Sequence, residues 1–494
     1  MDGPNKYTSA KHPGSLRDSF SDETLLQLGS LVVILIVGCA IRMVLLDRPA
    51  QYDESYTYAR FASKPLSVLF TSYEVPNNQL LHSFFVHMFT VILGDGLRVI
   101  RLPALIFGLF LIPATYLVAK ILYNNHAALL AAALVASSSA LIEYSTNARG
   151  YTMICFFTMV SLIIAARLNY RETWGAWAMF IVISAMGFYT APVMIFPFGT
   201  ICLWILATII SDGTTHNIKN RIATLVLAIL IIAVLTFLLY LPVVLNCGMH
   251  SILSNRFVMT QSWPFFVTNF PISIFSLWYY WNRDIPWILS QLLVAGFIIS
   301  LIFHKNLSLY RVPILIAVVF WCIPVVFIKR AVPYERVWLF LLPLYFIFAS
   351  AGISYPVKLL EQKFRYRFSL IPLVSIILCI FLTMIVYYSY PTYPMDLRDG
   401  EQIALFLKGY LKPHDTVLAI EPSDAPLEYY FIKYNIPLNY LNASIGPSNR
   451  VVLVINDSSP GIILDPARVS SNFQGSCVLL KRFSSSSLYE IAEK

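Results

Sequence analysis

Two adjacent carboxylates, Asp53 and Glu54, follow an apolar stretch of the sequence at residues 25–46. The chain has only 26 acidic residues among 494, so a pair just after an apolar stretch suggests a chemical role. A carboxylate can serve as the general base that takes a proton from a hydroxyl group. The alternative is a structural role, because acidic residues stabilise the first turn of a helix. Since adjacent side chains point in different directions, we expect one carboxylate to be the base while the other orients a neighbour or caps a helix.

Two short stretches at the ends of later apolar runs carry basic and aromatic residues. If both lie on the same side of a membrane as the carboxylate pair, cations and carboxylates meet at one site. A lipid phosphate gains charge when a sugar leaves it, so a positioned arginine stabilises the transition state more than the ground state. The planar fork of arginine can also hold two phosphate oxygens. The candidate phosphate-binding residues are Arg149, Tyr151, Arg330, Tyr334 and Arg336.

Each of these candidates also has a structural explanation. Arginine at the end of a membrane span can anchor the span or set its orientation, and tyrosine is common at the same depth. Asn78 and His82 lie between the carboxylates and the first basic stretch, and they are further candidates for substrate contact. For His82 the alternative is an ordinary polar residue at the membrane interface.

The composition places these residues in a membrane protein. Hydrophobic residues make up 58% and charged residues 12% of the chain, whereas a soluble domain carries roughly 25% charge. The net charge of +9 suits the inner leaflet of a membrane. No compact basic run with interleaved aromatics occurs, so we expect no nucleic-acid partner. The seven cysteines form no CxxC pair, and without a dedicated ligand cluster we expect no required metal or other cofactor.

The hydropathy pattern predicts a polytopic helical protein. A span needs about 20 apolar residues, and we count about eleven candidates. They are residues 25–46, 99–120, 127–143, 151–168, 175–190, 192–210, 222–245, 286–303, 312–328, 337–353 and 368–388. Residues 1–24 are then a cytoplasmic tail, residues 25–388 the membrane domain, and an odd number of spans puts residues 389–494 outside. A modest excess of Lys and Arg on inner segments, clearest at residues 358–367, supports this orientation.

The segments between spans have structure of their own. In the first outer loop we expect a short helix at about residues 54–62 and a helix from Asn78, whose apolar residues recur on one face. The loop at residues 246–286 is rich in tryptophan and tyrosine, as at a membrane interface. After residue 388 the pattern is that of a small α/β domain. Its expected helices are 401–411 and 425–434, and its expected strands are 416–420, 450–455 and 477–482.

Five short motifs, taken together, resemble those of a known class of enzymes. In order, they are Asp53-Glu54, Asn77 to His82, Leu97 to Pro103, Asn147 to Thr152, and Pro333 to Arg336. The chain is similar to the polytopic glycosyltransferases of the GT-C class. It resembles the branch that includes protein O-mannosyltransferases, the aminoarabinose transferase of lipid A, and bacterial lipid A galacturonosyltransferases. The resemblance covers residues 25 to about 355 in order and spacing.

The resemblance implies an activity and its partners. The donor would be a polyprenyl-phosphate-linked hexose or pentose, and the acceptor a hydroxyl of a glycan, lipid or protein. Transfer would occur with inversion on the extracytoplasmic side of the cell membrane, among membrane lipids. Asp53 would be the general base, supported by Glu54. Some relatives bind a divalent metal near this site, and the uncharged Asn147 departs from the glutamate that the class often carries there.

Two other classes of function remain open. A transporter or flippase for a lipid-linked sugar is the alternative, but transporters usually carry ionisable groups or broken helices within their spans. Here the spans are almost free of charge, with Arg42 and Glu143 near span ends. A scaffold with a partner-binding outer tail is the third class, although anchoring needs far fewer than eleven spans.

Overall fold

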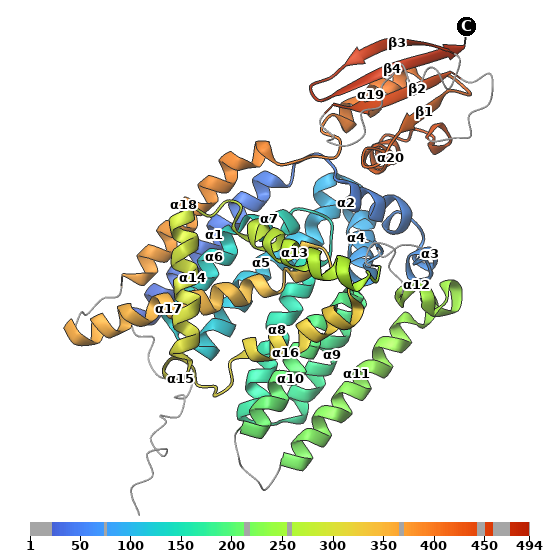
Figure 1. Ribbon diagram of the computed structural model, residues 1–494. Coiled ribbons are helices and arrows are strands. Elements are labelled where there is room, and N and C mark those ends of the chain that lie inside the picture. Colours follow the sequence, from blue (N-terminus) through green and yellow to red (C-terminus); the bar gives the residue numbers. More distant parts are fainter. Residues whose placement is uncertain are drawn as a thin grey trace, which may run out of the picture.

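The computed structural model describes residues 22–73, 77–211, 218–253, 259–364, 370–441, 450–457 and 475–493. A large bundle of helices carries a smaller C-terminal domain at one end (Figure 1). The expected fold class is confirmed: the chain is a mostly helical, multi-pass membrane protein with a C-terminal α/β domain. Of the expected cytoplasmic tail at residues 1–24, all but the last three residues lie outside the described part.

Each of the eleven stretches expected to span the membrane contains a helix. These helices are α1 (Asp22–Leu45), α5 (Leu97–Leu122), the pair α6 (Asn125–Ser137) and α7 (Ser139–Ser145), α8 (Tyr151–Tyr170), α9 (Trp174–Thr190), α10 (Ile195–Ser211), α11 (Ile218–Cys247), α14 (Trp287–Ile302), α16 (Ile314–Lys329), α17 (Leu341–Phe364) and α18 (Ile371–Ser389). Among the described residues, six helices are long and apolar enough to cross a membrane, or eight if each of two bent pairs counts as one span. The apolar parts of α9, α16 and α17 are shorter, so the count of eleven stays a prediction.

One predicted span is broken in the middle. Helices α6 and α7 meet at Ser138 with a bend of 60°, and the end of α6 therefore leaves backbone carbonyls without helical partners. The buried guanidinium of Arg42, on α1, donates to the carbonyls of Ala136 at 2.7 Å and Val135 at 3.4 Å. The charge inside the first span thus satisfies the backbone at this break.

Replacing Arg42 by methionine should lower the free energy of unfolding by about 1–3 kcal/mol, because the carbonyls lose a charged donor where water is scarce. Thermal unfolding of the purified protein in detergent measures this change. Arg171→Met, at an exposed arginine, is the control and should change stability by less than about 0.5 kcal/mol. Equal melting temperatures for the two variants would contradict this role of Arg42.

The loops between spans contain the expected interfacial helices. The loop between α1 and α5 holds α2 (Tyr52–Thr57), a π-helical turn (Tyr58–Ala62), α3 (Leu66–Thr71) and α4 (Leu80–Leu93). The expected helix from Asn78 begins two residues later, at Leu80. In the aromatic loop lie α12 (Met249–Leu253) and α13 (Trp263–Asn282), which is bent by 113° against α14. A short helix α15 (His304–Leu307) follows α14.

The C-terminal domain packs two helices and a four-stranded sheet. Its elements are α19 (Gly400–Tyr410), β1 (Thr416–Ala419), α20 (Asp424–Lys433), β2 (Val451–Asn456), β3 (Gly475–Arg482) and β4 (Ser486–Glu493). The strand order is β1-β2-β4-β3, with β1 parallel to β2 and β4 antiparallel to both of its neighbours. All five expected elements are present. Strand β4 was not expected, because it begins in the serine run at residues 484–487.

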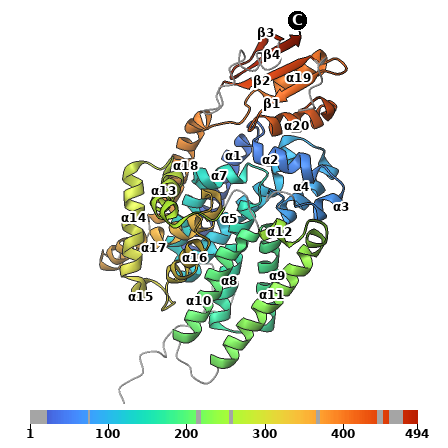
Figure 2. The same cartoon turned by 45° about the vertical axis from the view of Figure 1, so that its right-hand side comes forward.

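The C-terminal domain directly contacts the loop between α1 and α5. Helix α20 lies next to α2 in both views of the molecule (Figures 1 and 2). The rings of Tyr58 and Tyr429 meet edge to face across this contact, with centroids 5.5 Å apart. The helix that carries both carboxylates therefore lies between the membrane bundle and the C-terminal domain.

Candidate active site

The two adjacent carboxylates have different surroundings, and Glu54 is the buried one. Its side chain is fully inaccessible and forms an ion pair with Arg101. One carboxylate oxygen of Glu54 accepts from Arg101 Nε at 2.9 Å and from the backbone N–H of Ala148 at 2.8 Å. The other accepts from the Gln51 N–H at 3.0 Å, which closes a capping box at the start of α2.

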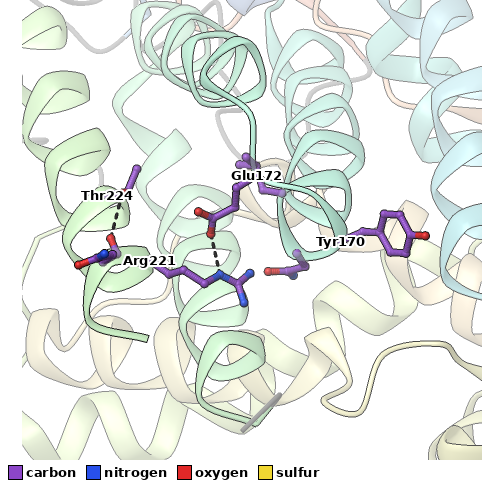
Figure 3. Close-up of a pocket in the computed structure, with 7 residues that line it drawn as sticks. Tyr170, Glu172, Arg221 and Thr224 are labelled. Atoms are coloured by element: carbon purple, nitrogen blue, oxygen red, sulfur yellow. Dashed lines mark hydrogen bonds and ion pairs between the residues drawn. The ribbon is translucent and has the colours of Figure 1, made fainter. Parts of the chain in front are cut away.

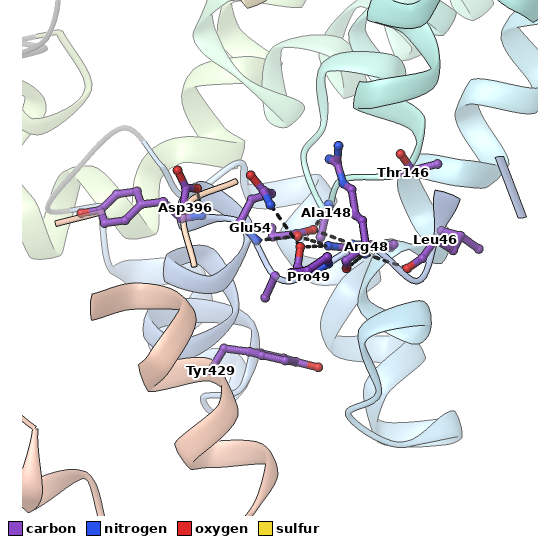
Figure 4. A network of polar contacts seen from close by, with 12 residues as sticks. Leu46, Arg48, Pro49, Glu54, Thr146, Ala148, Asp396 and Tyr429 are labelled. Atoms are coloured by element: carbon purple, nitrogen blue, oxygen red, sulfur yellow. Dashed lines mark hydrogen bonds and ion pairs between the residues drawn. The ribbon is translucent and has the colours of Figure 1, made fainter. Parts of the chain in front are cut away.

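Arg101 connects this pair to the end of the first span. Its guanidinium also donates to the carbonyls of Leu46 and Arg48, both at 2.7 Å, and of Pro49 at 3.1 Å, and Figure 4 shows this network. Burial alone would raise the pKa of Glu54, but the charge and hydrogen bonds of Arg101 hold that pKa below its usual value. All its partners are structural, so Glu54 is an ionised cap and not a group that can reach substrate.

Asp53 faces a different set of residues. Its carboxylate accepts from Arg336 Nη1 at 2.9 Å and from the Asn77 side-chain amide at 3.3 Å. About a quarter of the Asp53 side chain is exposed, against none of Glu54. Both partners of Asp53 line a cavity, so this carboxylate lies at the edge of a space that a substrate could enter.

That cavity has a volume of about 290 Å³ and combines cations, tyrosines and apolar side chains. Its polar lining comprises Tyr73, Asn77, Gln79, Arg149, Tyr151, Lys329, Tyr334 and Arg336. Four of the residues expected from the sequence are in this set: Arg149, Tyr151, Tyr334 and Arg336. Segments that are nearly 200 residues apart in the chain thus meet at one place, at the end of the bundle that faces the C-terminal domain (Figure 1).

Arg149 is held rigidly beside the cavity. It is almost fully buried, and its Nη1 donates to Thr57 Oγ1 at 2.7 Å and to the Asn77 carbonyl at 2.9 Å. Its guanidinium carbon lies 5.8 Å from the centre of the Tyr151 ring. Asn77 therefore bridges Asp53 and Arg149. The expected site did not include Asn77, although it begins one of the motifs that indicated the enzyme class.

Asn78, the expected site residue, lies away from the cavity. Its buried amide donates to the carbonyls of Leu69 at 2.9 Å and Ser72 at 2.8 Å. It holds the loop between α3 and α4, and the backbone turns so that Asn77 faces the cavity instead. The prediction of substrate contact by Asn78 is not supported by this position.

His82 is likewise buried and does not line the cavity. Its ring nitrogens have no hydrogen-bond partner among the described residues. Burial and the nearby charge of Arg149 lower the pKa of His82 to about 3, so the ring is neutral. It packs beside Gly150, where an added Cβ would lie 3.1 Å from the His82 Cβ and 2.7 Å from Thr190. In this position His82 supports the loop that carries Arg149.

Arg330 also differs from its expected position. Helix α16 ends at Lys329, and Arg330 adopts a left-handed conformation with φ of 50°. The change of backbone direction turns its side chain towards Trp263, with the guanidinium carbon 5.7 Å from the ring centre. Arg330 does not line the cavity, whereas its neighbour Lys329 does. The basic pair was visible in the sequence, but which member faces the site depends on where the helix ends.

No group of three His, Cys, Asp or Glu side chains that could hold a metal occurs in the described ranges. Asn147, where the class often has glutamate, is buried, and its side-chain oxygen has no partner among these residues. The expectation that no metal is required stays a prediction.

A second pocket, of about 340 Å³, lies at the far end of α8 (Figure 3). It is lined by polar residues between α8 and α11, including an ion pair between Arg221 and Glu172 at 2.6 Å. Since α8 has 20 residues, this pocket is about 30 Å from the helix end that carries Tyr151. None of the expected site residues lines it.

Comparison with known proteins agrees with this architecture. Residues 76–240 match a family described as dolichyl-phosphate-mannose-protein mannosyltransferase. Two solved structures of ArnT from Cupriavidus metallidurans, in the apo state and bound to undecaprenyl phosphate, superpose with a TM-score of 0.61. Each is 12% identical, and the match covers 94% of this chain and 98% of ArnT. The fold is that of a GT-C glycosyltransferase.

The resemblance to the GT-C class is thus confirmed. A more distant match to the oligosaccharyltransferase of Archaeoglobus fulgidus has a TM-score of 0.47 and 13% identity, over 81% of this chain and 61% of that one. A search of curated protein sequences finds no significant match. The GT-C fold and the family match together support an enzyme that transfers sugars.

Loss of charge should destabilise the protein far more at Glu54 than at Asp53. Glu54→Gln leaves Arg101 buried without its counter-charge and should lower the free energy of unfolding by about 3–5 kcal/mol. Asp53→Asn removes a partly exposed ion pair and should lower it by no more than about 1 kcal/mol. Thermal unfolding of both variants in detergent checks this difference. If Glu54→Gln were as stable as Asp53→Asn, the structural role of Glu54 would be wrong.

Proposed function

We propose that the protein transfers a hexose or pentose from a polyprenyl-phosphate-linked donor to an acceptor hydroxyl, with inversion, on the extracytoplasmic side of the membrane. The observation that carries this proposal is the Asp53 carboxylate, held 2.9 Å from Arg336 at the edge of a cavity that also contains Arg149 and Lys329. A base and several cations at one cavity are what transfer from a lipid phosphate requires. We propose no required metal, and the acceptor can be a glycan, a lipid or a protein.

The cations support a phosphate-linked donor. As the sugar leaves, negative charge develops on the phosphate, and a cation about 4 Å away contributes on the order of 4 kcal/mol at an effective dielectric of about 20, before desolvation. Arg149 is already immobilised by Thr57 and Asn77, so little reorganisation is needed. ArnT from Cupriavidus metallidurans has been solved with undecaprenyl phosphate, and we propose a lipid of that class for this chain.

The apolar part of the cavity supports a prenyl chain next to the phosphate. Beside the cations, the lining includes Val193 from the turn before α10, Ile195 and Phe196 from the start of α10, and Val325 from α16. These apolar side chains share one cavity with the cations. A lipid tail lying there would bring its phosphate to Arg149 and Lys329 without taking the charge into the membrane core.

Asp53 supplies the base in this proposal. The acceptor hydroxyl donates its hydrogen to the Asp53 carboxylate and attacks the anomeric carbon from the face opposite the phosphate. The new glycosidic bond forms as the bond to the phosphate breaks, and the proton passes to Asp53. The ion pair with Arg336 orients the carboxylate at the edge of the cavity. One displacement of this kind inverts the anomeric centre.

A transporter or flippase for a lipid-linked sugar is the alternative function. It would need neither a base nor an acceptor. The broken span at α6 and α7 is a feature of some transporters, but here its free carbonyls are occupied by Arg42. Labelled donor in sealed vesicles separates the two functions, since a transferase forms a covalent product and a flippase only moves the label.

Asp53→Asn should lower kcat for sugar transfer by about 10²–10⁴-fold, because the amide cannot accept the hydroxyl proton. The measurement is transfer from a polyprenyl-phosphate sugar by the purified variant in lipid, with stability checked by thermal unfolding. Asp415→Asn, a carboxylate inside the C-terminal domain, is the control. Transfer at the wild-type rate by a folded Asp53→Asn protein would exclude Asp53 as the base.

Lys329 and Arg330 provide a matched pair of basic neighbours. Lys329→Gln should raise KM for the lipid donor about fivefold, because it removes one cation from the cavity, a contact of about 1 kcal/mol. Arg330→Gln should change KM by less than about twofold, since this side chain lies against Trp263 and its rim charge contributes little. Steady-state kinetics against donor concentration tests both. A larger effect at Arg330 would mean that the phosphate binds elsewhere.

A further inference from the structure

The linker between α18 and the C-terminal domain reaches the start of the helix that carries the proposed base. The Asp396 carboxylate accepts the backbone N–H of Tyr52 at 2.6 Å, and Tyr52 directly precedes Asp53. The first N–H groups of a helix have no partner within the helix. Two carboxylates satisfy them here: Glu54 accepts from Gln51, and Asp396 accepts from Tyr52.

Asp396 is itself fixed to the C-terminal domain. Its backbone carbonyl accepts from the Asn456 side-chain amide at 2.6 Å and from Ser423 Oγ at 3.1 Å. Asn456 is the last residue of β2, and Ser423 directly precedes α20. The packed core of that domain therefore sets the position of the Asp396 carboxylate. The hydrogen bond from the Tyr52 N–H to this carboxylate in turn fixes the backbone of α2.

The orientation of the Asp53 side chain depends on the backbone of α2 more than the orientation of Glu54 does. Glu54 is fully buried, with four hydrogen bonds to Arg101, Ala148 and Gln51. Among the described residues, the Asp53 carboxylate has two partners, Arg336 at 2.9 Å and Asn77 at 3.3 Å, and the side chain is partly exposed. A carboxylate held by so few side-chain contacts is aimed largely by the helix turn on which it stands.

The same linker also contacts the turn between α13 and α14. Tyr393 donates its hydroxyl to Asp284 at 2.5 Å, and its ring lies 4.0 Å from the guanidinium carbon of Arg283. Arg283 in turn pairs with Glu143 at 2.8 Å, six residues before Arg149. Tyr393 is thus connected through Arg283 to the end of α7, while Asp396 contacts the start of α2.

We propose that Asp396 is a positioning residue for sugar transfer, which fixes the first turn of α2 and so aims the Asp53 carboxylate at the acceptor hydroxyl. The inference rests on the proposed function of Asp53. It makes the C-terminal domain part of the catalytic apparatus, although none of the domain's described residues lines the cavity. A displacement of the base by about 1 Å can cost 10²-fold in rate, so one hydrogen bond to the backbone can matter.

The test compares Asp396→Ala with Asp396→Asn and Asp415→Ala in the full-length protein. Asp396→Ala removes the acceptor, and kcat should fall about tenfold or more while KM for the lipid donor stays within about twofold. Asp396→Asn keeps a side-chain oxygen for the Tyr52 N–H and should retain kcat within about threefold. Asp415 pairs with Arg450 inside the domain, so Asp415→Ala reports general destabilisation and should keep kcat.

Hydrogen exchange provides a second measurement that does not depend on activity. Peptides covering residues 47–60 should exchange faster in Asp396→Ala than in the wild type, and Asp415→Ala should not change them. Wild-type kcat in Asp396→Ala, an equal loss in Asp415→Ala, or lost activity with unchanged exchange would each overturn the inference. Failure of the proposed function looks different: the wild type forms no glycoside, or Asp53→Asn remains active, while the exchange of residues 47–60 still depends on Asp396.

Discussion

The buried ion pair between Glu54 and Arg101 is the constraint on which the end of the helical bundle next to the C-terminal domain depends. Neither charge reaches solvent, and a buried ion without its partner costs several kcal/mol. The hydrogen bonds of Arg101 to the carbonyls of Leu46 and Arg48, and of Glu54 to the N–H of Ala148, attach two further segments to this pair, whose members lie on α5 and α2. The end of α1, the start of α2 and the loop before α8 must therefore stay together.

This constraint leaves the adjacent carboxylate free for chemistry. Successive residues on a helix point about 100° apart, so burying Glu54 turns Asp53 towards Arg336 and Asn77. One carboxylate anchors the short helix, and the other lies at the edge of the cavity. The same separation of two carboxylates by their environments lets one active site hold groups with different roles.

The cavity itself is assembled from segments that share no local signal. Arg149 comes from the loop before α8, Lys329 from the end of α16, and Arg336 from the turn before α17. The three cations all lie at or near helix ends, because a charged side chain at the end of a bundle does not have to enter the apolar core. The C-terminal domain completes this arrangement by holding α2 through Asp396.

The helical membrane fold, the α/β domain and four residues of the cavity lining could be predicted from the sequence, because apolar stretches, periodicity and charges at their ends are local properties. Whether Asn77 or Asn78, and Lys329 or Arg330, faces the cavity could not be predicted in this way. Each choice depends on the direction of the backbone at one residue, such as the left-handed turn at Arg330. The roles of Arg42 and Asp396 also depend on tertiary contacts. Their partners lie about 90 and 340 residues away in the chain, beyond the reach of any local pattern.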